Sequence, residues 1–92
     1  MKVFLKSIAD LRDYFGREPQ EIELKDDAIL QDLLYAIDER WGRVLPSYLW
    51  NSAKKQFRGP VYFLINKEVI QDMHTPLKDG LQIDLMKALV GG

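Results

Sequence analysis

The order of alternating and periodic segments predicts an α+β fold, in which one main helix packs across one face of a sheet. Short runs of alternating apolar and polar residues occur towards both ends of the chain, as is typical of strands with one wet face. A single run between them carries apolar residues at helical spacing. A helix placed between two groups of strands is expected to cover a sheet that both groups share. The chain has 92 residues, and we expect one domain over residues 1–92.

The first strand is predicted at residues 1–8, MKVFLKSI, because Val3 and Leu5 face one way while Lys2 and Lys6 face the other. The following segment, ADLRDYFGREP, predicts a helical turn that ends in a loop.

A second strand is predicted at residues 21–25, EIELK, where Ile22 and Leu24 alternate with glutamates. We expect it to pair with the first strand as an antiparallel hairpin.

The main helix is predicted within residues 26–42, DDAILQDLLYAIDERWG. Its apolar residues fall at positions i, i+3, i+4, i+7 and i+11 and form a single stripe. These residues are Leu30, Leu33, Leu34, Ile37 and Trp41. Asp26 or Asp27 is expected to cap the start of the helix, and Gly42 to stop it.

Residues 43–60 give a weaker pattern. Pro46 is expected to open a short helix that carries Tyr48, Leu49 and Trp50, and the stretch NSAKKQFRG is expected to be an exposed loop. The two tryptophans, Trp41 and Trp50, are expected to cap the core, because aromatic rings bury large areas.

The C-terminal half predicts three more strands. Residues 61–66, VYFLIN, are apolar enough for a central, largely buried strand, and a tight turn at Asn66-Lys67 returns the chain through EVI. The loop HTPLKDG turns at Asp79-Gly80. The final strand, LQIDLM, is expected to turn Leu81, Ile83 and Leu85 inward.

Composition excludes several classes of function. The net charge of −1 gives no global argument for binding nucleic acid or a membrane. The absence of cysteine excludes disulfides, thiolate metal sites and a cysteine nucleophile. His74, the only histidine, is expected to lie in a surface loop, and Lys54–Arg58 is expected to be a solvated loop and no nucleic-acid contact. No leader and no apolar stretch of membrane-spanning length is recognised, so we expect a cytoplasmic protein.

Three stretches together resemble the ubiquitin-like β-grasp sulfur-carrier family. They are INKEVI at 65–70, HTPLKDGLQIDL at 74–85 and the terminal VGG. The likeness covers essentially the whole chain and includes the small subunit of molybdopterin synthase and the thiamin-pathway carrier. It implies a ubiquitin-like β-grasp with a mixed four- to five-stranded sheet, and a flexible tail over residues 87–92. The Pro-Pro pair usual in the molybdopterin-synthase subunit is replaced here by Lys87-Ala88.

The resemblance implies that the Gly92 carboxylate is the reacting group. An ATP-using enzyme of the ubiquitin-activating type would adenylate it, and the product would become a thiocarboxylate or an amide conjugate. Gly91 and Gly92 lack side chains, which suits a terminus that threads a narrow channel. The chain itself is expected to be no enzyme and to bind no cofactor or metal, since the partner would supply ATP and Mg²⁺.

Apolar residues before the two glycines suggest a docking strip for partners. The strip comprises Met86, Lys87, Leu89 and Val90, with Phe4 on the same surface. The simpler interpretation is the fraying end of a core strand. The expected partners are the adenylating enzyme and a sulfur-accepting enzyme such as a synthase large subunit, in hetero-complexes.

Two other functions remain open at this point. One is a ubiquitin-like modifier attached to lysines through Gly92. The other is a β-grasp interaction module that carries out no chemistry and in which the terminal glycines are incidental.

Overall fold

The computed structural model describes residues 1–88, and its first two strands form the expected hairpin. Strand β1 (Lys2–Ser7) pairs antiparallel with β2 (Gln20–Glu23), with Val3 opposite Ile22. The segment between them is helical, as predicted. It comprises a 3-10 turn (Ala9–Leu11) and α1 (Arg12–Phe15). Leu11 and Phe15 are buried from this segment and fix it against the core.

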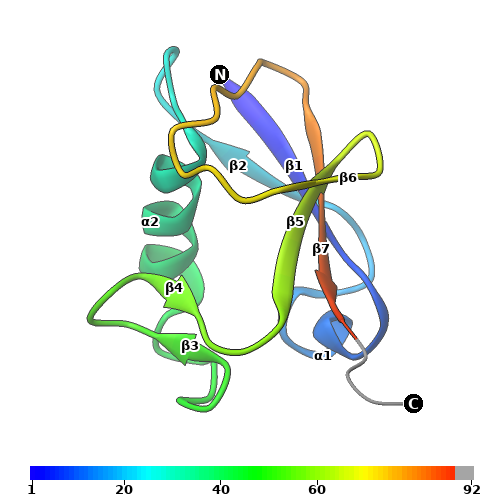
Figure 1. Ribbon diagram of the computed structural model, residues 1–92, viewed down its shortest axis with the longest axis vertical. Coiled ribbons are helices and arrows are strands. Elements are labelled where there is room, and N and C mark those ends of the chain that lie inside the picture. The colour runs from blue at the N-terminus through cyan, green and yellow to red at the C-terminus, as the bar shows by residue number, and fades with distance from the viewer. Residues whose placement is uncertain (89–92) are drawn as a thin grey trace.

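The strands form one mixed five-stranded sheet in the order β2-β1-β7-β5-β6 (Figure 1). Strands β5 (Val61–Ile65), β6 (Glu68–Ile70) and β7 (Gln82–Lys87) supply the second half of the sheet. Strand β7 runs parallel to β1, and the other pairs are antiparallel. The last strand of the described chain therefore occupies the middle of the sheet.

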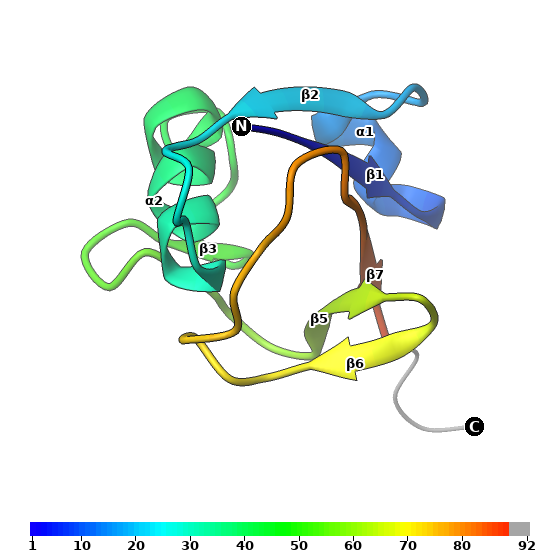
Figure 2. The same ribbon diagram turned by 90° about the horizontal axis from the view of Figure 1, so that it is seen from above.

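The main helix α2 (Leu30–Trp41) covers one face of this sheet, as predicted. All five residues of its apolar stripe are buried. They pack in one cluster with Val3, Leu5, Ile83 and Leu85, the inward side chains of β1 and β7. Figure 2 shows the sheet curling so that its concave face turns towards α2.

The start of α2 differs from the expectation that Asp26 or Asp27 caps it. The carboxylate of Asp32 instead accepts a hydrogen bond of 2.8 Å from the Ile29 N–H. The N–H groups of Leu30 and Gln31 donate to carbonyl oxygens of the loop before β7, at 2.9 and 3.0 Å. A capping aspartate is unnecessary because this loop satisfies the donors that a helix start leaves free.

The helix and exposed loop expected over residues 46–59 are wrong. The N–H groups of Leu49 and Trp50 both donate to the Pro46 carbonyl at 3.0 Å, which forms a turn and no helix. Strands β3 (Trp50–Asn51) and β4 (Gln56–Phe57) then form a separate two-stranded ribbon. The ribbon is held because Phe57 packs edge-to-face on Trp50 and on Phe63 of β5.

Aromatic rings close this end of the core, as expected for the tryptophans. Trp41 and Trp50 are both buried. The rings of Phe15 and Trp41 meet edge-to-face with centroids 4.9 Å apart, and those of Trp50 and Phe57 at 4.8 Å. The stretch Lys54–Arg58 is therefore only partly solvated, since its phenylalanine joins this cluster.

Strand β5 is less buried than its composition predicts. It has neighbours on both sides, but only Phe63 is buried. Within residues 1–88 no helix covers Tyr62 and Leu64 on the outer face, and Val61 on the helix side lines a cavity. The turn to β6 forms as predicted, with Asn66 and Lys67 at φ 52° and 68°. The corner at Asp79-Gly80 is also confirmed. Gly80 has φ +80°, and its N–H donates to the Lys2 carbonyl at 2.7 Å.

Candidate functional site

Strand β7 carries the chain towards its C-terminal residues and is fixed from both sides. Phe4 to Ser7 of β1 pair with residues 82–85, and Val61 to Leu64 of β5 pair with residues 84–87. Ile83 and Leu85 point into the core and are fully buried. Such a strand cannot shift along its length without exposing these side chains, so the point where it ends is fixed.

The pairing of β7 continues further on the β5 side than on the β1 side. Lys87 lies opposite Val61, and the Ala88 N–H donates to the Pro60 carbonyl at 2.7 Å. On the β1 side the last bond runs from the Ile8 N–H to the Leu85 carbonyl, at 3.0 Å. Of the expected tail over residues 87–92, Lys87 belongs to β7 and Ala88 is bonded to Pro60, whereas residues 89–92 lie outside the described residues.

The expected site residues Leu89, Val90, Gly91 and Gly92 lie outside the described residues. Phe4 and Met86 lie within them, and both are half-buried on the outer face of the sheet, opposite α2. Met86 is four residues beyond Gln82, the partner of Phe4, which separates the two by about 13 Å along the strands. Lys6 and Asp84 stand between them.

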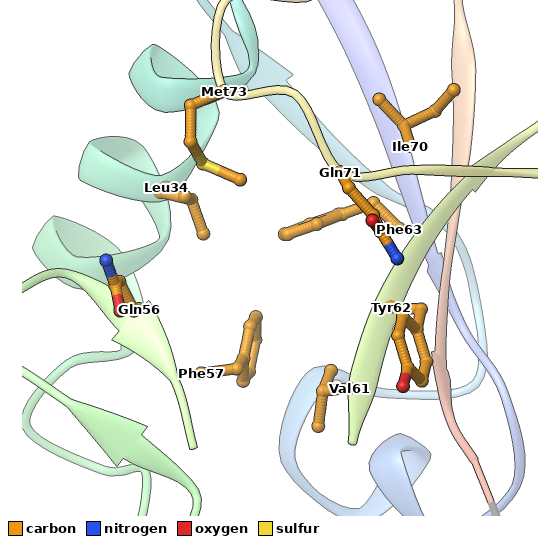
Figure 3. Close-up of a pocket in the computed structure, with 9 residues that line it drawn as sticks. All are labelled: Leu34, Gln56, Phe57, Val61, Tyr62, Phe63, Ile70, Gln71 and Met73. Atoms are coloured by element: carbon orange, nitrogen blue, oxygen red, sulfur yellow. The ribbon is translucent and has the colours of Figure 1, made fainter. Parts of the chain in front are cut away.

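Three further apolar residues share this outer face and were not singled out from the sequence. Tyr62 lies opposite Met86, and Leu64 lies opposite both Asp84 and Val69. Figure 3 shows the ring of Tyr62 on the far side of β5 from the neighbouring cavity. Alternation along β5 carried this signal, but the register that places these residues beside Met86 appears only in the fold. We call the set formed by Tyr62, Leu64, Val69 and Met86 the outer apolar face.

A cavity of about 330 Å³ opens on the helix side of the sheet, between α2, β4, β5 and the loop after β6 (Figure 3). Its walls include Leu34, Phe57, Phe63 and Met73. It is lined by no carboxylate, histidine, lysine or arginine. Apart from the phenol of Tyr62, the described lining consists of apolar and amide side chains.

Metal ligands and membrane-spanning helices are two further features that bear on function. Within residues 1–88, no three histidine or carboxylate side chains come together as metal ligands. His74 is exposed in the loop after β6, as expected. Over the same residues, no helix has the length and apolar character needed to cross a membrane.

The mixed sheet with one helix in its concave face and an open outer face defines a ubiquitin-like β-grasp protein. The sequence matches the ThiS family over residues 6–92, and the chain belongs to this family of ubiquitin-like sulfur carriers. Members of the family are small non-catalytic carriers, so the chain is a carrier protein and no enzyme. No curated protein matches the sequence.

Solved structures confirm the fold. SAMP1 from Haloferax volcanii superposes with a TM-score of 0.76 at 18% identity and covers 100% of both chains. Urm1 from Trypanosoma brucei gives 0.72 at 15% identity, with 99% of this chain and 95% of that one covered. A complex of subunits 1 and 2 of the molybdopterin-converting factor from Helicobacter pylori gives 0.65 at 26% identity, with 100% of both chains covered.

Proposed function

We propose that this chain is a sulfur carrier whose Gly92 carboxylate is adenylated by an ATP-dependent enzyme of the ubiquitin-activating type and converted to a thiocarboxylate. The observation that carries the proposal is the placement of β7. The strand is hydrogen-bonded on both sides in the middle of the sheet and leads within a few residues to Gly91-Gly92. Membership of the ThiS family supports the same chemistry.

The chemistry proceeds in two displacements. A carboxylate oxygen of Gly92 attacks the α-phosphorus of ATP, and pyrophosphate leaves. Hydrosulfide then attacks the carbonyl carbon, AMP leaves, and a thiocarboxylate remains. The first step requires the oxygen about 3–3.5 Å from phosphorus and in line with the leaving group. ATP and Mg²⁺ belong to the partner, and this chain binds no cofactor.

The fold limits how far the reacting carboxylate extends from the sheet. Four residues, 89–92, follow Ala88, the last described residue, which is bonded to the Pro60 carbonyl next to β5. An extended chain of four residues spans at most about 14 Å. The reaction centre of the partner therefore lies within that distance of the Pro60 edge of the sheet. A side chain at position 91 or 92 would crowd the channel by which the tail enters.

The outer apolar face supplies the docking surface in this proposal. Phe4 extends it across β1, whereas Lys87 lies opposite Val61 and faces the other side of the sheet. In the proposal, Lys87, Leu89 and Val90 contact the partner as part of the chain segment that the partner holds. The second partner is a sulfur-accepting enzyme, such as a synthase large subunit. The Helicobacter pylori relative, which was solved with subunit 2 of the molybdopterin-converting factor, supports a partner of this kind.

The test is a reconstitution with the adenylating enzyme of the same organism, ATP and sulfide. Intact mass should rise by about 16 Da, because sulfur replaces one oxygen. A variant that lacks Gly91-Gly92 should show no increase, whereas the exposed-loop variant Lys78→Ala should behave as the native chain. Absence of both the adenylate and the mass increase in the native chain would contradict the proposal.

A second candidate is conjugation to proteins, because the Nζ of a lysine can displace AMP from the same adenylate. The fold shared with SAMP1, described as a small archaeal modifier protein, favours it. Gly-Gly remnants on lysines of cellular proteins would support it. Partner binding that survives removal of Gly91-Gly92, without either product, would instead support a plain interaction module.

A further inference from the structure

A cleft of about 270 Å³ lies at the end of β1, beside the last strand. Three cations line it. Lys6 comes from β1, Arg12 from α1, and Arg17 from the loop between α1 and β2. Asp84 of β7 is the one carboxylate in the lining. We call this feature the basic cleft.

The three cations of the basic cleft are available to a ligand. All are exposed, and within residues 1–88 no carboxylate lies at ion-pairing distance from any of them. Arg12 is oriented by its own loop, since its Nε donates to the Ala9 carbonyl at 3.1 Å. Ala9 itself has a left-handed backbone conformation, with φ +57°. Among the described residues, no hydrogen bond or ion pair occupies the two terminal amino groups of this guanidinium.

We propose that the basic cleft binds a carboxylate-bearing segment of the enzyme that activates the C-terminal tail. This inference rests on the proposed function and names a contact surface for its first partner. The cleft adjoins the strand that carries the tail, because the Ile8 N–H donates to Leu85 and Lys6 lies opposite Asp84. A partner that holds the tail therefore also reaches the cleft. Arginine pairs with carboxylates through two parallel hydrogen bonds, which fixes orientation as well as charge.

Carboxylates fit the basic cleft better than nucleic acid does. A phosphodiester backbone carries closely spaced charges and is bound by a continuous stripe of cations. Here Asp84 interrupts the lining, and Asp10 and Asp13 belong to the same short helical segment as Arg12. The net charge of the chain is −1, which gives no general attraction for phosphates. A single acidic side chain can pair with the cations without approaching these carboxylates. An extended polyanion would lie close to them and be repelled.

The experiment measures ATP–pyrophosphate exchange with the adenylating enzyme of the same organism, as a function of the concentration of this chain. The test variant is Arg12→Glu with Arg17→Glu. The matched control is Arg43→Glu with Lys78→Glu, which changes the net charge equally at two exposed sites outside the basic cleft. The test variant should raise KM roughly tenfold or more, with kcat within about twofold, because surface charges act on encounter and register. Raising salt from about 50 to about 300 mM should raise the native KM and lower that of the test variant, because screening weakens attraction in the first case and repulsion in the second.

Equal KM changes in the two variants, or none, would overturn the inference. If the native chain is never adenylated, the proposed function is wrong. The basic cleft is then tested without the enzyme. In that arm, a short serine-glycine peptide that carries a single glutamate should shift the amide resonances of Ser7, Ile8 and Ala9 in the native chain but not in the test variant. No shift would overturn the inference, and so would the same shifts with a single-stranded oligonucleotide in place of the peptide.

Discussion

The indole Nε1 of Trp50 donates a hydrogen bond of 2.7 Å to Oδ1 of Asp38 and so joins the β3–β4 ribbon to the main helix. Ser52 Oγ donates to the same oxygen at 2.7 Å, and Lys55 Nζ lies 3.1 Å from Oδ2. These bonds lower the pKa of Asp38 from 3.8 to about 2. The bond from Trp50 contributes most, followed by those from Ser52 and Lys55. The ribbon is therefore anchored on a charged carboxylate.

The substitution Asp38→Asn should lower the melting temperature at pH 7, because an amide oxygen accepts these bonds less strongly than a carboxylate. The pKa of Asp38 is lower in the folded chain, so its stabilisation is fully present above pH 3.8 and is lost as pH falls towards 2. The difference between native chain and variant should shrink over that window. Thermal unfolding followed by circular dichroism from pH 7 to 2 measures it.

The control for this prediction is Asp27→Asn, which removes a charge from an exposed position before α2. It should leave the melting temperature at pH 7 nearly unchanged. A difference between the native chain and Asp38→Asn that stays constant from pH 5 to 2 would refute the role of the carboxylate charge.

Gly42 ends α2 where the Asp38 carboxylate folds back over the helix end. A Cβ at this position would lie 2.6 Å from Asp38 Oδ1 and would also collide with the Asp38 carbonyl. Gly42→Ala should therefore destabilise the chain by about 1–3 kcal/mol, as overpacking typically does. Urea unfolding measures the change. The cost should be smaller in an Asp38→Ala background, and equal costs in the two backgrounds would show that the carboxylate is not the obstacle.

The turn between β5 and β6 holds Lys67 at φ 68°, where a side chain is strained. Lys67→Gly creates the Asn-Gly pair that two-residue hairpins prefer and should stabilise the chain by about 1 kcal/mol. Lys78→Gly is the matched control, because Lys78 is exposed and lies outside the left-handed region. That change should be neutral or destabilising. A gain of equal size in both variants would remove the conformational explanation.

Met86 lies on the outer apolar face beside Tyr62, where the proposed partners dock. Met86→Glu should weaken binding to the adenylating enzyme roughly tenfold or more, because it places a charge in the apolar contact. Calorimetric titration measures the affinity, and thermal unfolding shows that the fold persists. Phe4→Ala tests whether the surface extends across β1. Gln31→Glu on α2, at the other side of the sheet, should bind as the native chain does, and a loss there equal to that of Met86→Glu would count against this face.

The sequence identified the elements whose side chains repeat with a clear period. The stripe of α2 and the alternation of β1 and β7 each mark a buried face, because burial of apolar area is the main local constraint on such elements. The β3–β4 ribbon escaped detection because its strands are two residues each and are held by Phe57 packing on Phe63. The cap at the start of α2 was not predicted for a related reason. The free N–H groups of its first turn donate to carbonyl oxygens of a loop some forty residues further along the chain.

The sequence by itself determined the α+β class, the main helix, the positions along the chain of the five strands of the main sheet and the terminal glycines on which the proposed chemistry depends. Only the tertiary structure placed β7 between β1 and β5 and so brought Tyr62, Leu64 and Val69 beside Met86. It also gathered Lys6, Arg12 and Arg17 around one cleft. The physical reason is the same in both cases. Periodicity records which side of an element faces the core, whereas the neighbours on its open side depend on strand order and register, which distant parts of the chain fix together.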